Sequence, residues 1–230
     1  MDINTIFEYR DGFLDFLKGY DVDNYLYTWD TPEANRIKHG YQNTHIEPVP
    51  SEEFITKAIN HPNVPPGNLN WHHNYKQFYT MKRATEWVAN HGQYDYVFQT
   101  RVDVVFKIDN PDYLKEWIEY PEWYTTIHTP ERGVWNESEQ KYVDWPIGFD
   151  GRMYLNDQVG GGSPEMMKKA WDYRGDDILK PMFHNSAFSE RVLEKVMAMN
   201  GVNYRNARAT FWGLNGDRHK YMQSKDRSTW

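Results

Sequence analysis

Two charged residues, Arg101 and Asp103, interrupt one of the most strand-like segments of the chain. The segment from Tyr94 to Phe106 reads YDYVFQTRVDVVF, and its β-branched and aromatic residues favour a buried β-strand. Residues at i and i+2 of a strand point to the same face, so we expect the two side chains to lie together. A buried carboxylate needs a cation or hydrogen bonds to offset its desolvation. Either Asp103 binds a divalent cation while Arg101 contacts a diphosphate, or the two residues form an internal ion pair.

A second polar group, Asn156-Asp-Gln158, stands directly before Gly160-Gly-Gly162. Glycines allow a ligand to approach the backbone closely, and the helix start predicted at Ser163 would offer N–H groups to anions or hydroxyl-rich ligands. The segment lacks the Gly-Lys-Ser/Thr ending of a P-loop and the Gly-x-Gly-x-x-Gly fingerprint. Asp157 is therefore a candidate general base. A glycine-rich turn without a ligand is the alternative.

Two further candidates surround the start of the last predicted helix. Glu190 lies in its first turn, where the carboxylate either faces a substrate hydroxyl or complements the helix dipole. His184, a few residues earlier, is a candidate metal or phosphate ligand. Because the chain has no cysteine, its metal ligands can only be oxygen and nitrogen atoms, which favours Mg²⁺ or Mn²⁺.

Hydrophobic periodicity and turn residues place these side chains among alternating helices and strands. Helices are predicted over 6–18, 51–59, 74–90, 111–120, 163–173 and 189–199. Strands are predicted over 23–29, 94–106, 123–128, 153–155, 202–205 and 210–212. We expect 33–50 to be irregular, 61–68 to be a proline-rich loop and 129–152 to be a flexible flap. The order of elements predicts an α/β protein.

Composition limits the class of protein. A chain of 230 residues is expected to form one domain. The net charge of −7, with scattered Lys and Arg residues, argues against nucleic-acid binding. The sequence has no apolar run of the ~20 residues that cross a bilayer and no signal-peptide pattern at its start, so we expect a cytoplasmic protein without a membrane span. Aromatic residues make up 17% of the chain, and Trp and Tyr are residues that stack on sugar rings.

Taken together, the motifs resemble glycosyltransferases of the GT-A fold, of the kind that build bacterial surface polysaccharides and viral glycans. The likeness covers about residues 14 to 212 and depends on the order of short motifs. These are Tyr25-Leu-Tyr-Thr-Trp29, a helix with Gln77, the strand up to Asp103, Asn156-Asp-Gln158 with its glycines, a helix with Met166 and Met167, and Ser189-Glu190. The resemblance implies one GT-A-like domain over 1–230, with the metal and nucleotide part at about 1–110 and the acceptor part at about 111–230. It also implies a central, mostly parallel mixed sheet flanked by helices.

The same resemblance implies a metal-assisted transfer of a sugar from a nucleotide-sugar donor to a glycan or lipid-linked acceptor. Asp103 takes the place of the metal-binding aspartate of the Asp-x-Asp motif, with Arg101 where the first acid often stands. Gln77 would join these two residues at the donor, and His184 would join Asp103 at the Mn²⁺ or Mg²⁺ ion. Asp157 or Glu190 would face the acceptor hydroxyl. Trp145 or Trp212 would form a platform for the sugar.

The chain departs from the family pattern in two ways. No short apolar strand precedes Ile6, so the first strand, which helps such enzymes to bind the nucleotide, is missing or supplied from elsewhere. Arginine at position 101 also leaves fewer metal ligands, so a metal-independent mechanism stays open. A non-catalytic carbohydrate-binding module, whose glycan binding would survive Asp103→Ala, is the alternative function. A metal-dependent phosphoesterase would need more clustered carboxylates or histidines than the sequence offers.

Overall fold

The computed structural model describes residues 3–51, 53, 69–102, 104–108, 110–129, 134–136, 141–143, 154–173, 189–207, 210–213 and 222–223. The helices are α1 (Ile3–Phe16), α2 (Pro32–Ile37), η1 (Lys38–Gly40), α4 (Leu69–His91), α5 (Pro111–Ile118), α6 (Pro164–Ala170) and α8 (Ser189–Met199). The strands are β1 (Tyr25–Trp29), β2 (Asn43–Glu47), β3 (Val97–Thr100), β4 (Val104–Lys107), β5 (Tyr124–Thr129), β6 (Val134–Asn136), β7 (Lys141–Val143), β8 (Tyr154–Gly162), β9 (Tyr204–Asn206), β10 (Thr210–Gly213) and β11 (Met222–Gln223). The protein is therefore mixed α/β, as the sequence predicted. None of the helices in the described ranges combines the length and the apolar character needed to cross a membrane.

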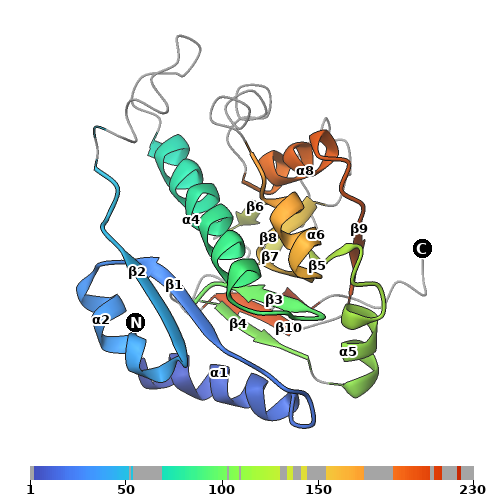
Figure 1. Ribbon diagram of the computed structural model, residues 1–230. Coiled ribbons are helices and arrows are strands. Elements are labelled where there is room, and N and C mark those ends of the chain that lie inside the picture. Colours follow the sequence, from blue (N-terminus) through green and yellow to red (C-terminus); the bar gives the residue numbers. More distant parts are fainter. Residues whose placement is uncertain are drawn as a thin grey trace.

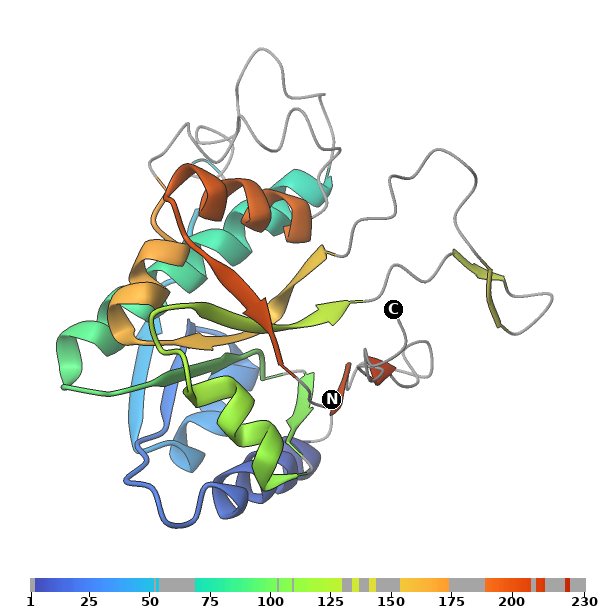
Figure 2. The same ribbon diagram turned by 90° about the vertical axis from the view of Figure 1, so that its right-hand side faces the viewer.

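Helices cover both faces of a central four-stranded sheet, whose strand order is β3-β8-β5-β9 (Figures 1 and 2). On one face α4, α6 and α8 enclose a core whose largest fully buried side chains are Phe78, Tyr124, Met167, Trp171 and Leu193. On the other face α1 and α5 enclose a second core, which contains Leu17, Ile108, Leu114, Trp117 and Val159. The sheet thus buries apolar side chains on both sides, which is the three-layer arrangement of an α/β domain.

Three helices begin with the same capping chemistry. The side chains of Thr31, Asn110 and Ser163 each accept a hydrogen bond from a backbone N–H in the first turn of α2, α5 and α6. In each case proline follows at the first helical position, where its missing N–H and fixed φ cost nothing. The helix start predicted at Ser163 is confirmed. The equivalent signal at Thr31 explains why part of 33–50, which we expected to be irregular, forms α2.

The strands of the central sheet are mostly antiparallel, so the prediction of a mostly parallel sheet was wrong. β8 runs antiparallel to both β3 and β5, and only β5 and β9 run parallel to each other. The described part of the connection from β5 to β8 is the β6–β7 hairpin rather than a crossover helix. A strand that returns without a crossover lies antiparallel to its predecessor. Elsewhere β2, in the second part of 33–50, runs parallel to β1.

The segment 94–106, predicted as one strand, forms two strands in different sheets. β3 pairs with β8, whereas β4 pairs with β10. Between them lie Arg101 and the exposed Val102. Because β3 ends at Thr100, Arg101 lies outside a strand, and strand geometry no longer supports the expectation that its side chain shares a face with that of Asp103. Asp103 itself lies outside the described residues.

Candidate functional site

Two predicted site residues, Gln77 and Asp157, meet between α4 and β8, although 80 positions separate them in the chain. Gln77 Nε2 donates a hydrogen bond of 2.7 Å to Asp157 Oδ2 and lies 3.4 Å from the backbone oxygen of Asp157. Asp157 is only 2% exposed. Its second carboxylate oxygen, Oδ1, has no hydrogen-bond partner in the part of the chain that the structure describes. Asp157 is thus a buried carboxylate that Gln77 holds at Oδ2, while Oδ1 can accept a hydrogen bond from a further donor.

An irregularity in β8 turns Asp157 toward α4. Leu155 pairs with His128 and Gly160 pairs with Thr126, so residues 156–159 of β8 stand opposite Ile127 alone. In a regular strand Asp157 and Val159 would share a face. Val159 instead packs in the core on the α1 and α5 side, while Asp157 contacts α4 on the other side. Bulges of this kind re-aim side chains and are common beside active sites.

The glycines after Asp157 complete β8 and do not form the turn that we predicted. They pair with β3 on one side and with β5 on the other. A Cβ atom added to Gly160 would collide with the hydroxyl of Tyr124, and one added to Gly161 would lie 2.6 Å from the hydroxyl of Tyr96. Glycine inside a strand marks a close approach by another group. Gly160 and Gly161 therefore make room for two tyrosine rings, and the approach of a ligand to this segment stays a prediction.

Further buried polar atoms lie on the same side of the sheet as Asp157. The Tyr124 hydroxyl, Trp171 Nε1 and both amide atoms of Gln99 lack hydrogen-bond partners within the described ranges. Burial raises the pKa of Tyr124 far above its ordinary value, and the negative charge of Asp157 raises it further, while the nearby indole N–H of Trp171 offsets only part of this, so the phenol stays protonated. Buried polar groups are normally hydrogen-bonded to protein, water or ligand. The region around Asp157 therefore has unused hydrogen-bonding capacity.

The Tyr124 hydroxyl provides a test of that capacity. We expect Tyr124→Phe to leave the free energy of unfolding unchanged or to raise it by up to about 1 kcal/mol, because it removes a buried hydroxyl without a partner among the described residues. Urea denaturation of both proteins measures the change. Tyr20→Phe, at a residue that is 56% exposed, is the control and should have no effect. A loss larger than about 1 kcal/mol would mean that water or a residue outside the described ranges binds the hydroxyl.

Arg101 joins the site through its backbone. It follows β3 directly, and its N–H donates to the carbonyl oxygen of Gln158 at 3.2 Å. This bond extends the β3–β8 ladder by one residue, so the Arg101 backbone lies beside the residue that follows Asp157. Glu190 lies in the first turn of α8, as predicted, and its side chain is outside the described part. The side chain of Trp212 on β10 and the whole of Trp145 are outside it too.

The residues expected to bind the metal ion, Asp103 and His184, both lie outside the described ranges. Within those ranges no three Asp, Glu or His side chains form a group that could hold a metal ion. The hydrogen-bond partner of Asp157 is an amide, and its other polar neighbour on the sheet is a phenol. The described part of the site does not by itself fit a divalent cation.

Comparisons with protein-family models and with curated proteins find no match for this chain. The arrangement of its own residues is therefore what points to a function. Among these, the strongest arrangement is the Gln77–Asp157 pair beside Arg101.

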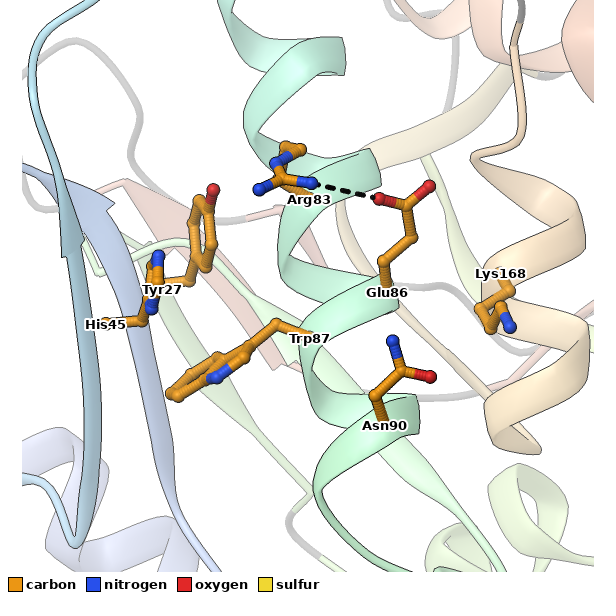
Figure 3. A pocket seen from close by; sticks show the side chains of 7 residues that line it. All are labelled: Tyr27, His45, Arg83, Glu86, Trp87, Asn90 and Lys168. Atoms are coloured by element: carbon orange, nitrogen blue, oxygen red, sulfur yellow. Dashed lines mark ion pairs between the residues drawn. The ribbon is translucent and has the colours of Figure 1, made fainter.

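A trough of about 400 Å³ lies beside the C-terminal half of α4, between β1 and β2 on one side and α6 on the other (Figure 3). Its lining residues come from β1, β2, α4 and α6 and are Tyr27, His45, Arg83, Glu86, Trp87, Asn90 and Lys168. We call it the α4 trough. None of these residues was among the predicted site residues. The signal in the sequence is the spacing of Arg83, Glu86, Trp87 and Asn90, which places all four on one helix face.

Glu47, at the end of β2, anchors one wall of the trough. Arg83 Nη2 lies 3.1 Å and His45 Nε2 lies 3.4 Å from its Oε1, and the side chain is 15% exposed. Burial raises the pKa of Glu47, but the neighbouring Tyr27 hydroxyl and the hydrogen bond and charge of Arg83 outweigh it, so the pKa falls below the ordinary 4.5. The ionised form is therefore the one that the folded protein stabilises.

We expect Glu47→Gln to lower the free energy of unfolding by about 1 kcal/mol at neutral pH. Because the folded protein depresses the pKa, this stabilisation is present above the ordinary value of 4.5 and is lost as the pH falls through the lower folded value. The difference between the wild type and the variant should shrink accordingly in urea denaturation at acidic pH. Glu8→Gln, at an exposed residue of α1, is the control. If the difference in the free energy of unfolding between the wild type and Glu47→Gln did not change with pH, the interactions of Glu47 with Arg83 and Tyr27 would not be what stabilises its ionised form.

Proposed function

We propose that the protein is a glycosyltransferase of the GT-A type that transfers a sugar from a nucleotide-sugar donor to a carbohydrate acceptor. The observation that carries the proposal is the hydrogen bond between Gln77 and Asp157. Both residues belong to the motifs that resemble these enzymes, and they are remote in the chain. The mixed α/β architecture and the position of Arg101 beside Gln158 support the same function.

In this proposal Asp157 binds and activates the acceptor. Its Oδ1 atom accepts a hydrogen bond from the attacking hydroxyl group, while Gln77 holds Oδ2 and fixes the plane of the carboxylate. If the reaction inverts the anomeric centre, the acceptor oxygen forms the new bond to the anomeric carbon and its proton passes to Asp157. The bond to the donor oxygen breaks, and the nucleotide leaves with the electron pair.

Arg101 is the residue that we assign to the leaving nucleotide. A guanidinium group forms charge-assisted, often bidentate, hydrogen bonds with phosphate oxygens. Its backbone position beside Gln158 puts it at the same end of the sheet as Asp157. Binding of Mn²⁺ or Mg²⁺ by Asp103 and His184, and an acceptor contact by Glu190, are separate expectations on which none of these steps depends.

The test is a panel of uridine, guanosine, thymidine and cytidine nucleotide sugars, each supplied with Mn²⁺ and with a chelator. We expect one nucleotide class to raise the melting temperature and to be released as free nucleotide when an acceptor glycan is added. The chelator arm measures the metal dependence. Neither release nor a thermal shift with any donor would contradict the proposal. Glycan binding that persists in Asp157→Ala without nucleotide release would favour the carbohydrate-binding module instead.

A further inference from the structure

The α4 trough has the shape of a binding site with two walls. Its floor is the helix face that carries Arg83, Glu86, Trp87 and Asn90, and Figure 3 shows β1 and β2 on one side and α6 on the other. Its volume of about 400 Å³ falls in the range of ~300–1,000 Å³ that is typical of small-ligand sites. Trp87 lies ten residues beyond Gln77 along α4, so the trough is about 15 Å from the Asp157 site along the helix axis.

One wall of the trough is aromatic and held in place by ring contacts. The Tyr27 ring stacks on His45 with centroids 5.1 Å apart and an interplanar angle of 12°. The His45 and Trp87 rings are 5.3 Å apart, and His91 meets Trp87 edge-on at 5.0 Å. Such a wall offers an apolar surface that needs little ordering upon binding, which suits the C–H face of a sugar ring.

The charges of the trough select for an anionic group. Arg83 lies 3.5 Å from Glu86 and is also paired with Glu47, and Lys82 lies 3.2 Å from Glu86. Lys168, on the opposite wall, forms no ion pair within the described ranges. With Glu47 included, the trough has two cations and two carboxylates, and Arg83 is shared by both carboxylates, so Lys168 is the cation left for a ligand. A cation on one wall attracts an anionic group to that wall, in a chain whose net charge is −7.

We infer that the α4 trough binds a carboxylate-bearing sugar residue of a glycan, with the ring against Trp87 and the carboxylate beside Lys168. A single cation without an ion-pair partner among the described residues matches a single carboxylate, whereas a diphosphate needs several cations or a metal ion. Asn90 and Glu86 supply the hydrogen-bonding groups that sugar hydroxyls require. The assignment of the trough as an acceptor subsite rests on the proposed function, but the binding of an oligosaccharide to the trough is measured without catalysis.

The test is calorimetric titration of the whole protein with trigalacturonate and a hyaluronan tetrasaccharide, with neutral maltotriose as the matched probe. We expect saturable binding of at least one acidic oligosaccharide, about tenfold tighter than maltotriose. Lys168→Gln should reduce acidic binding to the level of maltotriose. Lys115→Gln, at a lysine that is 74% exposed on α5, is the control and should change nothing. Trp87→Ala should weaken both classes, provided that its circular dichroism spectrum shows a folded protein.

Three results would overturn the inference. They are the absence of saturable binding by either acidic oligosaccharide, unchanged binding by Lys168→Gln, and displacement of the oligosaccharide by uridine diphosphate. Asp157→Asn separates this site from the proposed reaction, because it should stop nucleotide release while leaving oligosaccharide binding intact. If binding fails while nucleotide release is observed, the trough is not a subsite and the proposed function stands.

Discussion

Asp157→Asn is expected to lower the rate of acceptor-dependent nucleotide release by about 10²–10⁴-fold, the contribution typical of a general base. The substitution removes the charge and basicity of the carboxylate but keeps its shape. The side chain is 2% exposed and only Oδ2 has a hydrogen-bond partner among the described residues, so little stabilisation is lost with the charge. The melting temperature should therefore stay close to that of the wild type. Steady-state kinetics with the donor found in the nucleotide panel provide the measurement.

Asp15→Asn is the matched control, because that carboxylate is 79% exposed near the end of α1. Its rate should equal that of the wild type. Gln77→Ala removes the donor that holds Oδ2, and we expect a smaller loss of rate, because the base remains but its orientation is less fixed. If Asp157→Asn keeps nearly full activity with a normal melting temperature, Asp157 is not the base and the function assigned to the pair is wrong.

The contact between Gln77 and Asp157 could be anticipated only from a resemblance to known enzymes. Nothing in the local pattern around either residue indicates a partner 80 positions away. The opposite error arose at Gly160-Gly-Gly162, because consecutive glycines fit a turn and a crowded strand equally well. The deciding group is the ring of Tyr124, which comes from a different strand. The residue types near each position in the sequence thus did not reveal the contacts with distant elements that form the site.

The fold could be predicted best where a local signal decides the structure. The Ser163-Pro164 cap gave the start of α6, and the spacing of Phe78 and Met81 indicated α4. The break at Arg101 could not be predicted, since β-branched residues continue on both sides of it. What separates β3 from β4 is the choice of pairing partner, β8 for one and β10 for the other. The antiparallel direction of β8 in the central sheet was also not predicted, because the direction of a strand depends on the connection that leads to it and not on the residues of the strand.

Gly160→Ala is expected to have the largest effect on stability, a loss of about 1–3 kcal/mol in the free energy of unfolding. An added methyl group would collide with the Tyr124 hydroxyl, and the ring behind that hydroxyl is fully buried. β8 is paired on both sides, so its backbone cannot easily move away. The ring must shift instead, and it lies close enough to Asp157 for the charge of that residue to raise its pKa. Urea denaturation measures the stability, and nucleotide release should fall together with it.

Gly12→Ala is the control for the generic effect of replacing glycine. Among the described residues, no atom beyond the neighbouring residues and backbone of α1 itself lies within 4 Å of a Cβ added at Gly12, so alanine should raise the stability by up to about 1 kcal/mol through its helix propensity. The double variant Gly160→Ala/Tyr124→Phe tests the cause directly. Because the Tyr124 hydroxyl is the atom closest to the added methyl, its removal should recover part of the loss, and the ring carbons behind it should prevent full recovery. Strictly additive effects of the two substitutions would mean that the methyl group and the hydroxyl do not compete for one space, and that Gly160 is required for another reason.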